Sequence, residues 1–387
     1  MQKKLEILPF INDSDTYSGD VNSRLLLYCC SYKNPEPAFV FDLERIRSNY
    51  KIIQQAFEGC NVHYALKANS EVRILKTLKD NGASFETASI GEVKRLLELK
   101  VSPKKIIFSN PCKSKEDIVN LANMGIRYFS FENTKDLDRL INLVPKGVFV
   151  LRLNLNEIDP IHINYGATWD YIKTKIIPNP RYASAIQGIT YYGIHDIGLK
   201  SCEKLLSKNK LPNVKFINIG GAIQYDGLKE DLDAGYYNGG LIFFTEKLRI
   251  LKEKFKIDII VEPGTAVLYN ACNAIGRIKY VNNLCTGTLN YHLDLGPTIG
   301  LRKPPSVAYV LRESSLEIIM SKANILDAAC SQRIIGNIGS HERFHEGDRF
   351  IFPNVGMYSI MYICDFHLLQ IPEILFLPLR NTAVNNN

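Results

Sequence analysis

The chain has 387 residues, of which 46% are hydrophobic, enough for a barrel of about 250 residues and a second module. Lys and Arg outnumber Asp and Glu by only 47 to 40 and are scattered, so we expect no nucleic-acid partner. The sequence shows no apolar run of membrane-span length, no signal peptide and no zinc-type cysteine spacing, which predicts a soluble, cytoplasmic protein without a membrane partner or a metal site.

Residues 1–37 read as irregular, and a short strand at Ala38–Asp42 and a helix at Leu43–Phe57 follow. From residue 61 onward, β-rich runs alternate with segments whose apolar residues recur every three or four positions, as in an amphipathic helix. The strands predicted in this part are Val62–Lys67, Ser84–Ala88, Ile106–Asn110, Tyr128–Glu132, Val148–Asn154, Gly188–His195, Lys215–Gly220 and Asp258–Glu262.

This alternation predicts an α/β fold of parallel strands buried on both faces. A (β/α)8 TIM-type barrel over residues 38–265 is the simplest closed form, and an open doubly wound sheet is the alternative. No Gly-x-Gly-x-x-Gly follows any strand, which argues against the open sheet. After Gly264 the pattern changes to strands and turns, which predicts a mostly β second domain from residues 1–37 and 266–380, sandwich-like or barrel-like, with a disordered tail at 381–387.

In a TIM-type barrel the catalytic groups come from the carboxyl ends of the strands. Polar residues and glycines stand at many of these ends: Lys67, Glu86, Asn110, Arg152, His195, Gly220, Gly221 and Glu262. Taken singly, each has an ordinary structural explanation. A lysine at a strand end commonly extends into water, and a buried histidine is commonly a core residue.

The strings around these residues resemble the PLP-dependent ornithine/diaminopimelate/carboxynorspermidine decarboxylase family, whose fold type III barrel is shared with alanine racemase. The resemblance covers about residues 38–375 and keeps the order of the motifs. The matching strings are Tyr64-Ala65-Leu66-Lys67-Ala68-Asn69-Ser70, Phe85-Glu86-Thr87-Ala88-Ser89, Ser109-Asn110-Pro111-Cys112-Lys113, Leu151-Arg152-Leu153, His195, Ile219-Gly220-Gly221, Glu262-Pro263-Gly264, Cys330 and Gly356-Met357-Tyr358.

The resemblance implies that Lys67 carries pyridoxal 5'-phosphate (PLP) as a Schiff base, while Glu262 stabilises the protonated pyridine nitrogen and His195 stacks on the ring. It also implies that Gly220, Gly221, Gly264 and Tyr358 bind the phosphate. Glu86 and Arg152 are expected near the cofactor, although a buried structural ion pair would equally explain Arg152. Glu92 fits either the second-strand motif or a capping box with Ser89.

Cys330 is expected to be the second catalytic group. By composition alone it reads as a buried apolar cysteine. In the resembled family the corresponding thiol comes from the partner subunit and returns a proton to the substrate α-carbon after CO2 leaves. The resemblance therefore implies a homodimer with shared active sites.

The substrate half of the pattern departs from the family. Thr265 stands where ornithine decarboxylases have a phosphate-binding Arg, and Ser331, Gln332 and Arg333 replace the acidic segment that reads the distal amine. These departures favour an amino-acid substrate other than plain ornithine, with a distal carboxylate or a larger side chain. Asp294 lies where the resembled family often has an acidic substrate contact, so a substrate with a distal amine stays an alternative.

Two other functions stay open. A non-catalytic regulatory homologue would fit the altered phosphate loop, and a racemase would need a second base on the opposite face of the ring, where Cys330 is expected.

Overall fold

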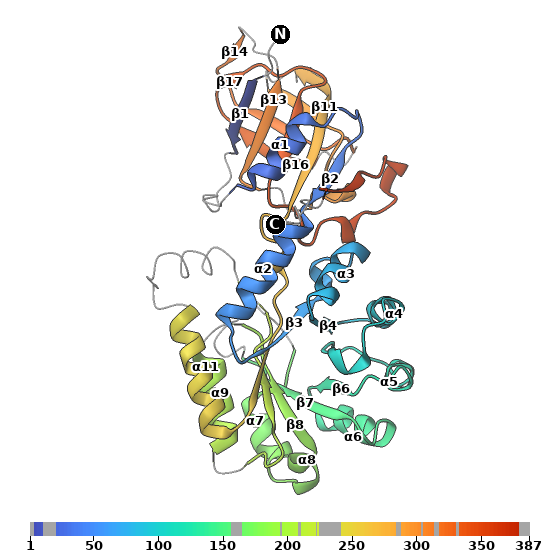
Figure 1. Cartoon of the computed structure of the whole chain (residues 1–387), viewed down its shortest axis with the longest axis vertical. Coiled ribbons are helices and arrows are strands. Elements are labelled where there is room, and N and C mark those ends of the chain that lie inside the picture. The colour runs from blue at the N-terminus through green and yellow to red at the C-terminus, as the bar shows by residue number, and fades with distance from the viewer. Residues whose placement is uncertain are drawn as a thin grey trace, which may run out of the picture. The chain divides into compact units, whose positions relative to one another are not determined.

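The computed structural model describes residues 4–10, 21–155, 165–193, 196–207, 210–221, 223, 241–283, 288–302, 305–312, 317–329 and 333–378. The chain divides into two compact units, Asn49–Val267 and a second unit made of Met1–Ser48 and Leu268–Asn387. Figure 1 shows the elements of both units.

Asn49–Val267 contains a closed barrel of eight parallel strands in the order β10-β3-β4-β5-β6-β7-β8-β9, which confirms the predicted fold class. The barrel strands are β3 (Asn61–Ala65), β4 (Ser84–Thr87), β5 (Ile106–Phe108), β6 (Tyr128–Phe131), β7 (Val148–Arg152), β8 (Ile186–Thr190), β9 (Phe216–Asn218) and β10 (Asp258–Val261). All eight predicted barrel strands are present, and each ends earlier than expected because the chain turns away at the barrel mouth.

The barrel interior is a packed core, as the alternation of strand side chains requires. The register aligns Ala65 with Glu86 and Glu86 with Ile107, so these residues share one face. Below that level, Tyr128 stacks on Phe216 with ring centroids 5.7 Å apart. A Cβ at Gly188 would lie 2.3 Å from the Phe216 ring, so only glycine fits beside this ring.

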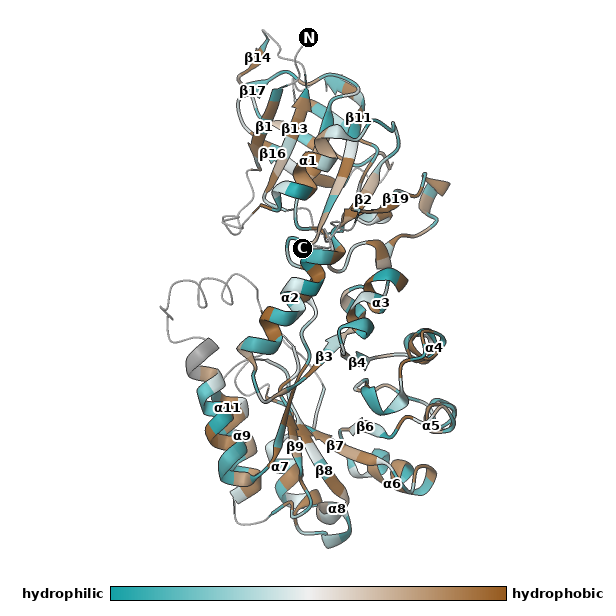
Figure 2. Cartoon of the chain, in the orientation of Figure 1, coloured by the Kyte–Doolittle hydropathy of each residue, from teal (hydrophilic) through white to brown (hydrophobic). Residues whose placement is uncertain are grey.

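Helices cover the outside of the barrel strands (Figure 1). The helices in this part of the chain are α2 (Leu43–Ala56), α3 (Val72–Asp80), α4 (Ile90–Glu98), α5 (Lys115–Asn123), α6 (Thr134–Leu143), α7 (Trp169–Tyr171), α8 (Pro180–Ala185), α9 (Asp196–Leu206), α11 (Leu241–Phe255) and α12 (Thr265–Leu268), with the short 3-10 turns η1 (Leu66–Ala68) and η2 (Pro103–Lys105) and the π-helix η3 (Ile172–Ile176). Figure 2 shows hydrophobic residues along β7 and β8, whereas the covering helices carry both kinds of residue, as amphipathic helices do.

The helix starts use side-chain caps. At α5, Ser114 and Asp117 form a reciprocal capping box. At α4, the Ser89 hydroxyl accepts the Glu92 N–H at 3.2 Å, and the Glu92 carboxylate accepts the Ala88 N–H at 2.7 Å. Glu92 is therefore engaged at the helix start, which is the capping alternative of its two expected roles.

The other unit is built on a mostly antiparallel sheet of nine strands, with order β1-β13-β18-β11-β12-β15-β16, in which β2 also pairs with β11 and β19 pairs with β2. Its strands are β1 (Lys4–Pro9), β2 (Ala38–Phe41), β11 (Cys272–Asn283), β12 (Leu289–Leu293), β13 (Val307–Arg312), β15 (Ala323–Leu326), β16 (Ile334–Ile338), β18 (Arg349–Phe352) and β19 (Glu373–Phe376), beside a separate pair β14 (Ile318–Ile319) and β17 (His341–Glu342). Its helical elements are α1 (Ser23–Ser31), η5 (Pro297–Ile299), η6 (Ile360–Tyr362) and η7 (Phe366–Leu368).

Two segments of this sheet unit differ from the sequence-based expectation. The strand at Ala38–Phe41 was expected in the barrel domain, but it pairs with β11 and β19. The region 1–37, expected to be irregular, contributes β1 and helix α1, whose Leu25 and Cys29 pack on the sheet. The strands that pair with β1 and β2 lie more than 200 residues away in the sequence, so a local sequence pattern cannot predict the pairing. The expected tail at 381–387 lies outside the described residues.

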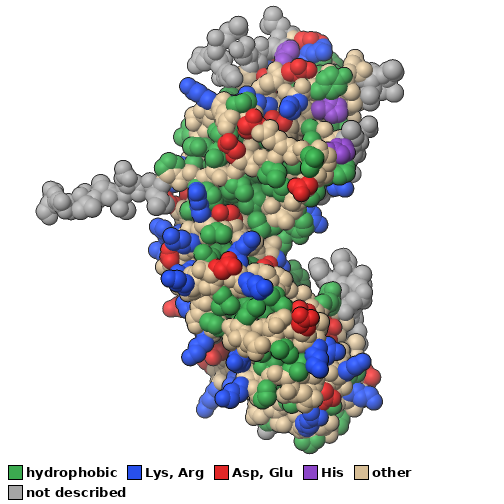
Figure 3. Space-filling model, turned by 90° about the vertical axis from the view of Figure 1, so that its right-hand side faces the viewer, with side chains coloured by type: hydrophobic (Ala, Val, Ile, Leu, Met, Phe, Trp, Pro, Cys, Tyr) green, Lys and Arg blue, Asp and Glu red, His purple; other side chains and the backbone are tan. Residues whose placement is uncertain are grey.

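On the face shown in Figure 3, Lys and Arg side chains are scattered among Asp and Glu, as the sequence suggested. Within the described residues, no helix is both long and apolar enough to cross a membrane.

Candidate active site

The carboxyl ends of the barrel strands bring four of the predicted residues to one mouth. Lys67 lies in the turn η1 directly after β3, Glu86 lies in β4, Arg152 ends β7, and Glu262 follows β10. Their charges influence one another, since Glu86, Lys67 and Arg152 all affect the ionisation of Glu262. The structure thus gathers residues that are far apart in sequence into one electrostatic group.

Lys67 and Glu86 form an ion pair, with Lys67 Nζ 3.6 Å from Glu86 Oε2. The lysine side chain is 47% exposed and the glutamate side chain 1% exposed, so the amine lies where a ligand can reach it. Glu86 Oε1 accepts a hydrogen bond from the Ser109 hydroxyl, while Oε2 is buried without a hydrogen-bond partner among the described residues. An unsatisfied buried oxygen of this kind calls for a further polar group.

Glu262 is buried, and burial raises its pKa to about 7. Burial is the largest cause of this rise to about 7 and the negative charge of Glu86 also contributes to it, whereas Lys67 and the hydrogen bond from Asn218 oppose it. A carboxyl with a pKa near neutrality changes its charge readily when a cationic group binds beside it.

The loop after β9 comes close to the loop after β10. Gly220 has φ +69°, and its carbonyl accepts the Glu262 N–H at 2.8 Å. A Cβ at Gly221 would lie 2.7 Å from the Glu262 carbonyl oxygen, and one at Gly264 would lie 3.0 Å from Ala68 Cβ. Glycine is required here because a side chain would collide with the neighbouring backbone or force a strained conformation.

The Gly220 N–H donates to Asn218 Oδ1 at 2.9 Å. Gly220 was expected to offer this N–H to a phosphate, but the donor is already in use inside the protein. Gly221 and Gly264 are therefore the candidate phosphate donors, and Gly220 shapes the turn.

Arg152 lies beside Tyr165, with its guanidinium carbon 5.4 Å from the ring centroid. Glu86 is paired with Lys67 and not with Arg152. Arg152 therefore acts on the carboxylates as a nearby positive charge, which opposes the rise that burial causes in the pKa of Glu262 and of Glu132.

Sequence reasoning missed Asn218 and Tyr128, and assigned no role to Ser109. Asn218 is fully buried at the end of β9, and its Nδ2 donates to Glu262 Oε1 at 2.7 Å and to Tyr128 Oη at 2.9 Å. The available signal was the period of two, which places Asn218 on the same strand face as the interior Phe216. Ser109 is the first residue of the Ser109-Asn110-Pro111-Cys112-Lys113 motif, which was noted only for its resemblance to the family.

Four predicted residues lie outside the described residues: His195, Cys330, Ser331 and Gln332. Arg333, next to them, is exposed and accepts the Asp327 N–H with its carbonyl at 3.2 Å.

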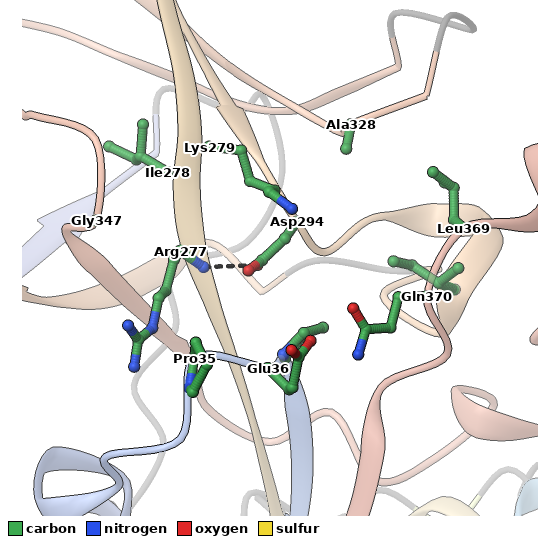
Figure 4. A pocket seen from close by; sticks show the side chains of 12 residues that line it. Pro35, Glu36, Arg277, Ile278, Lys279, Asp294, Ala328, Gly347, Leu369 and Gln370 are labelled. Carbon is green, nitrogen blue, oxygen red and sulfur yellow. Dashed lines mark hydrogen bonds between the residues drawn. The ribbon is translucent and has the colours of Figure 1, made fainter.

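In the sheet unit, Asp294 lines a pocket of about 380 Å³ together with Arg277, Lys279, Glu36 and Gln370 (Figure 4). Asp294 Oδ1 accepts the Arg277 N–H at 2.6 Å. Burial raises the pKa of Asp294 to about 6, partly offset by this bond and by Lys279 and Arg277. The pocket thus holds a poorly compensated carboxyl beside basic groups.

Tyr358, also in the sheet unit, has φ +49°. A tyrosine in the left-handed region is strained, and such strain is typical of functional sites. The observation fits the expectation that Tyr358 is a binding residue, although its own role stays a prediction.

Residues 43–167 match the family model described as "Pyridoxal-dependent decarboxylase, pyridoxal binding domain". The chain is 23% identical over 246 residues to ornithine decarboxylase of Saccharomyces cerevisiae, which is 58% of this chain and 50% of that protein. It is 24% identical over 273 residues to diaminopimelate decarboxylase of Aquifex aeolicus, which is 64% of this chain and 63% of that protein. The matched region thus spans about half to under two thirds of these relatives.

Solved structures share the fold over more of the chain. Arginine decarboxylase of Paramecium bursaria Chlorella virus has a TM-score of 0.76 and 18% identity, covering 92% of this chain and 100% of that one. Lysine/ornithine decarboxylase of Vibrio vulnificus, solved with cadaverine, also has a TM-score of 0.76 and 18% identity, covering 92% of this chain and 98% of that one.

The described residues fit PLP as a cofactor. PLP needs a lysine amine, an anionic partner for its ring nitrogen and N–H donors for its phosphate. Lys67 is accessible at the mouth, Glu262 is a carboxyl of shifted pKa beside it, and the backbone at Gly221 and Gly264 leaves no room for side chains.

Proposed function

Because this chain belongs to the pyridoxal-dependent decarboxylase family, we propose that it is a PLP-dependent enzyme that removes CO2 from an amino acid. The observation that carries the proposal is the ion pair of Lys67 with the buried Glu86 at the barrel mouth, beside the buried Glu262.

The residues have separate tasks. Lys67 would provide the amine that holds the cofactor. Glu262 provides the carboxylate for the ring nitrogen, Gly221 and Gly264 provide backbone donors for the phosphate, and Gly220 sets the turn. His195 and Tyr358 complete the binding set by the resemblance stated above. When bound, PLP supplies a conjugated ring that delocalises the electron pair left behind as CO2 departs.

Glu86 has a positioning task within this site. Its buried Oε2 lies 3.6 Å from Lys67 Nζ, so it orients the amine. The hydrogen bond from Ser109 occupies its other oxygen, which holds the carboxylate in one orientation.

Cys330 is the proposed donor of the proton that replaces CO2 on the substrate α-carbon. We propose that it acts across a homodimer, with the thiol of one subunit serving the Lys67 site of the other. The basis is the resemblance of the Asp327-Ala328-Ala329-Cys330 segment to the family motif, since Cys330 lies outside the described residues.

The substrate is proposed to be an amino acid other than plain ornithine. Ser331, Gln332 and Arg333 are the candidate contacts for its distal end, and the exposed Arg333 favours a carboxylate there. Asp294 is the candidate contact for an amine, since a bound cation would compensate its buried charge.

The first test is attachment of the cofactor. Wild-type protein mixed with PLP and reduced with borohydride should carry the cofactor on the peptide that contains Lys67, as read by mass spectrometry. Lys67→Ala should abolish the label, whereas Lys76→Ala, a change at an exposed lysine on α3, should leave it intact. Labelling of Lys67→Ala at the wild-type level would refute the assignment of Lys67.

The second test is CO2 release from a panel of basic, acidic and aminopropylated amino acids. Release from one member supports the decarboxylase and excludes a non-catalytic regulator. Exchange of the α-hydrogen in deuterated water without CO2 release would instead identify a racemase.

A further inference from the structure

Asn218 connects the two halves of the candidate cofactor site. It is fully buried at the end of β9 and makes three side-chain hydrogen bonds. Nδ2 donates to Glu262 Oε1 at 2.7 Å and to Tyr128 Oη at 2.9 Å, and Oδ1 accepts the Gly220 N–H at 2.9 Å. One neutral side chain therefore contacts both the carboxylate and the glycine turn.

The orientation of this amide is determined by its partners. A backbone N–H can only donate, so the group that faces Gly220 must be the amide oxygen. Both hydrogens of Nδ2 are then directed to Tyr128 and Glu262. The opposite orientation would leave two donors facing each other at Gly220.

This orientation has a consequence for Glu262. Oε1 receives a hydrogen from Asn218 and therefore acts as an acceptor whether Glu262 is charged or neutral. A proton on the carboxyl is favoured on Oε2, since an Oε1 that carries no proton is the better acceptor for the Nδ2 hydrogen. Asn218 thus distinguishes the two oxygens of Glu262 without adding charge beside Glu86.

We propose that Asn218 is a positioning residue that holds Glu262 with Oε2 available to the ring nitrogen of PLP, and that its bond to Gly220 couples this end of the site to the phosphate turn. The inference rests on the proposed function, because it concerns how the same site binds its cofactor.

The test compares the affinities of PLP and of 1-deaza-PLP, in which CH replaces the ring nitrogen. Asn218→Ser keeps a short acceptor for the Gly220 N–H but does not reach Glu262. We expect it to weaken PLP binding roughly 10- to 100-fold, the effect of losing a hydrogen bond to a charged group, and to change 1-deaza-PLP binding less than about twofold. Asn218→Leu, which loses both bonds, should weaken both ligands, and PLP more strongly.

Tyr128→Phe is the matched control, because it removes the other acceptor of the same amide and should leave the ratio of the two affinities unchanged. Far-UV circular dichroism establishes that each variant is folded. If Asn218→Leu does not fold, the comparison of the two ligands is made with Asn218→Ser alone. Equal loss of both ligands, or no loss of either, would overturn the inference while PLP binding by the wild type upholds the proposed function. A wild-type chain that binds neither ligand would overturn the proposed function itself.

Discussion

Glu262 is buried and Asp294 is partly buried, and each carboxyl adds an energetic cost to folding because burial disfavours its charged form. They lie in different units, Glu262 after β10 of the barrel and Asp294 after β12 of the sheet. In both, the local sequence shows only an acidic residue after an apolar strand. Their perturbed ionisation comes from residues packed around them.

Glu262 should make the stability of the cofactor-free chain depend on pH. The pKa of Glu262 is about 7 in the folded chain, whereas a solvated glutamate of the unfolded chain has a pKa of 4.5. The folded chain therefore binds this proton more tightly. The contribution of Glu262 to stability is therefore fully present below about pH 4.5 and is lost as pH rises through 7, by at most about 3 kcal/mol. Urea unfolding between pH 4.5 and 8 should show this decline, and Glu262→Gln should reduce it. Equal slopes for both proteins would contradict the prediction.

Asp294→Asn should stabilise the chain at pH 8. The asparagine oxygen can still accept the Arg277 N–H, while the cost of burying a charge disappears. Since the pKa of Asp294 is raised from 3.8 to about 6, the gain is at most about 3 kcal/mol at pH 8 and vanishes near pH 4. The melting temperature measured at both pH values checks this.

Asp117→Asn is the control of opposite sign. Hydrogen bonds from Ser114 lower the pKa of Asp117 in the capping box of α5, so its charged form is favoured by folding. Replacing it should destabilise the chain at pH 8. A gain at Asp117, or a loss at Asp294, would show that burial and hydrogen bonding do not govern these carboxyls.

At the scale of elements, the alternation of strand and helix was predictable, because each barrel strand is a short apolar run followed by an amphipathic helix. The ends were less predictable. Lys67 was expected as the last residue of a strand, yet β3 ends at Ala65 and the lysine lies in the turn η1. The apolar pattern continues through that turn, since Leu66 and Ala68 are buried.

The turn after β9 gives a prediction for Gly221. A methyl group there would lie 2.7 Å from the Glu262 carbonyl oxygen, so Gly221→Ala must displace backbone that we propose to bind phosphate. We expect PLP affinity to fall at least about tenfold, with a smaller fall for pyridoxal, which lacks the phosphate. Equilibrium dialysis measures both.

Gly91→Ala is the comparison for that change, because a Cβ at Gly91 meets its nearest neighbour at an ordinary 3.7 Å. Its affinities for both ligands should equal those of the wild type. Equal losses for PLP and pyridoxal in Gly221→Ala would argue that the loop does not bind phosphate.

At the scale of the whole molecule, the proposed homodimer has a direct consequence. If Lys67 of one subunit works with Cys330 of the other, each single variant loses both of its sites. Mixing Lys67→Ala and Cys330→Ala proteins under subunit exchange should then restore up to about a quarter of the wild-type activity, because a heterodimer contains one site with both native residues.

Activity of the mixture, measured as CO2 release beside each variant alone, checks this prediction. The formation of heterodimers is measured separately by mass, with the two variant subunits prepared at different masses. No recovery despite complete exchange would place both residues in the site of a single subunit.

The sequence by itself determined the barrel, the mostly β second domain and the identity of Lys67, Glu86, Arg152 and Glu262 as strand-end residues. These follow from local periodicity and from motifs that are continuous in the chain. The tertiary structure alone decided that β2 belongs to the sheet, that Lys67 pairs with Glu86, and that Asn218 joins Glu262 to Gly220. Each of these depends on hydrogen bonds or charges between residues distant in sequence, which exist only once the strands have found their register.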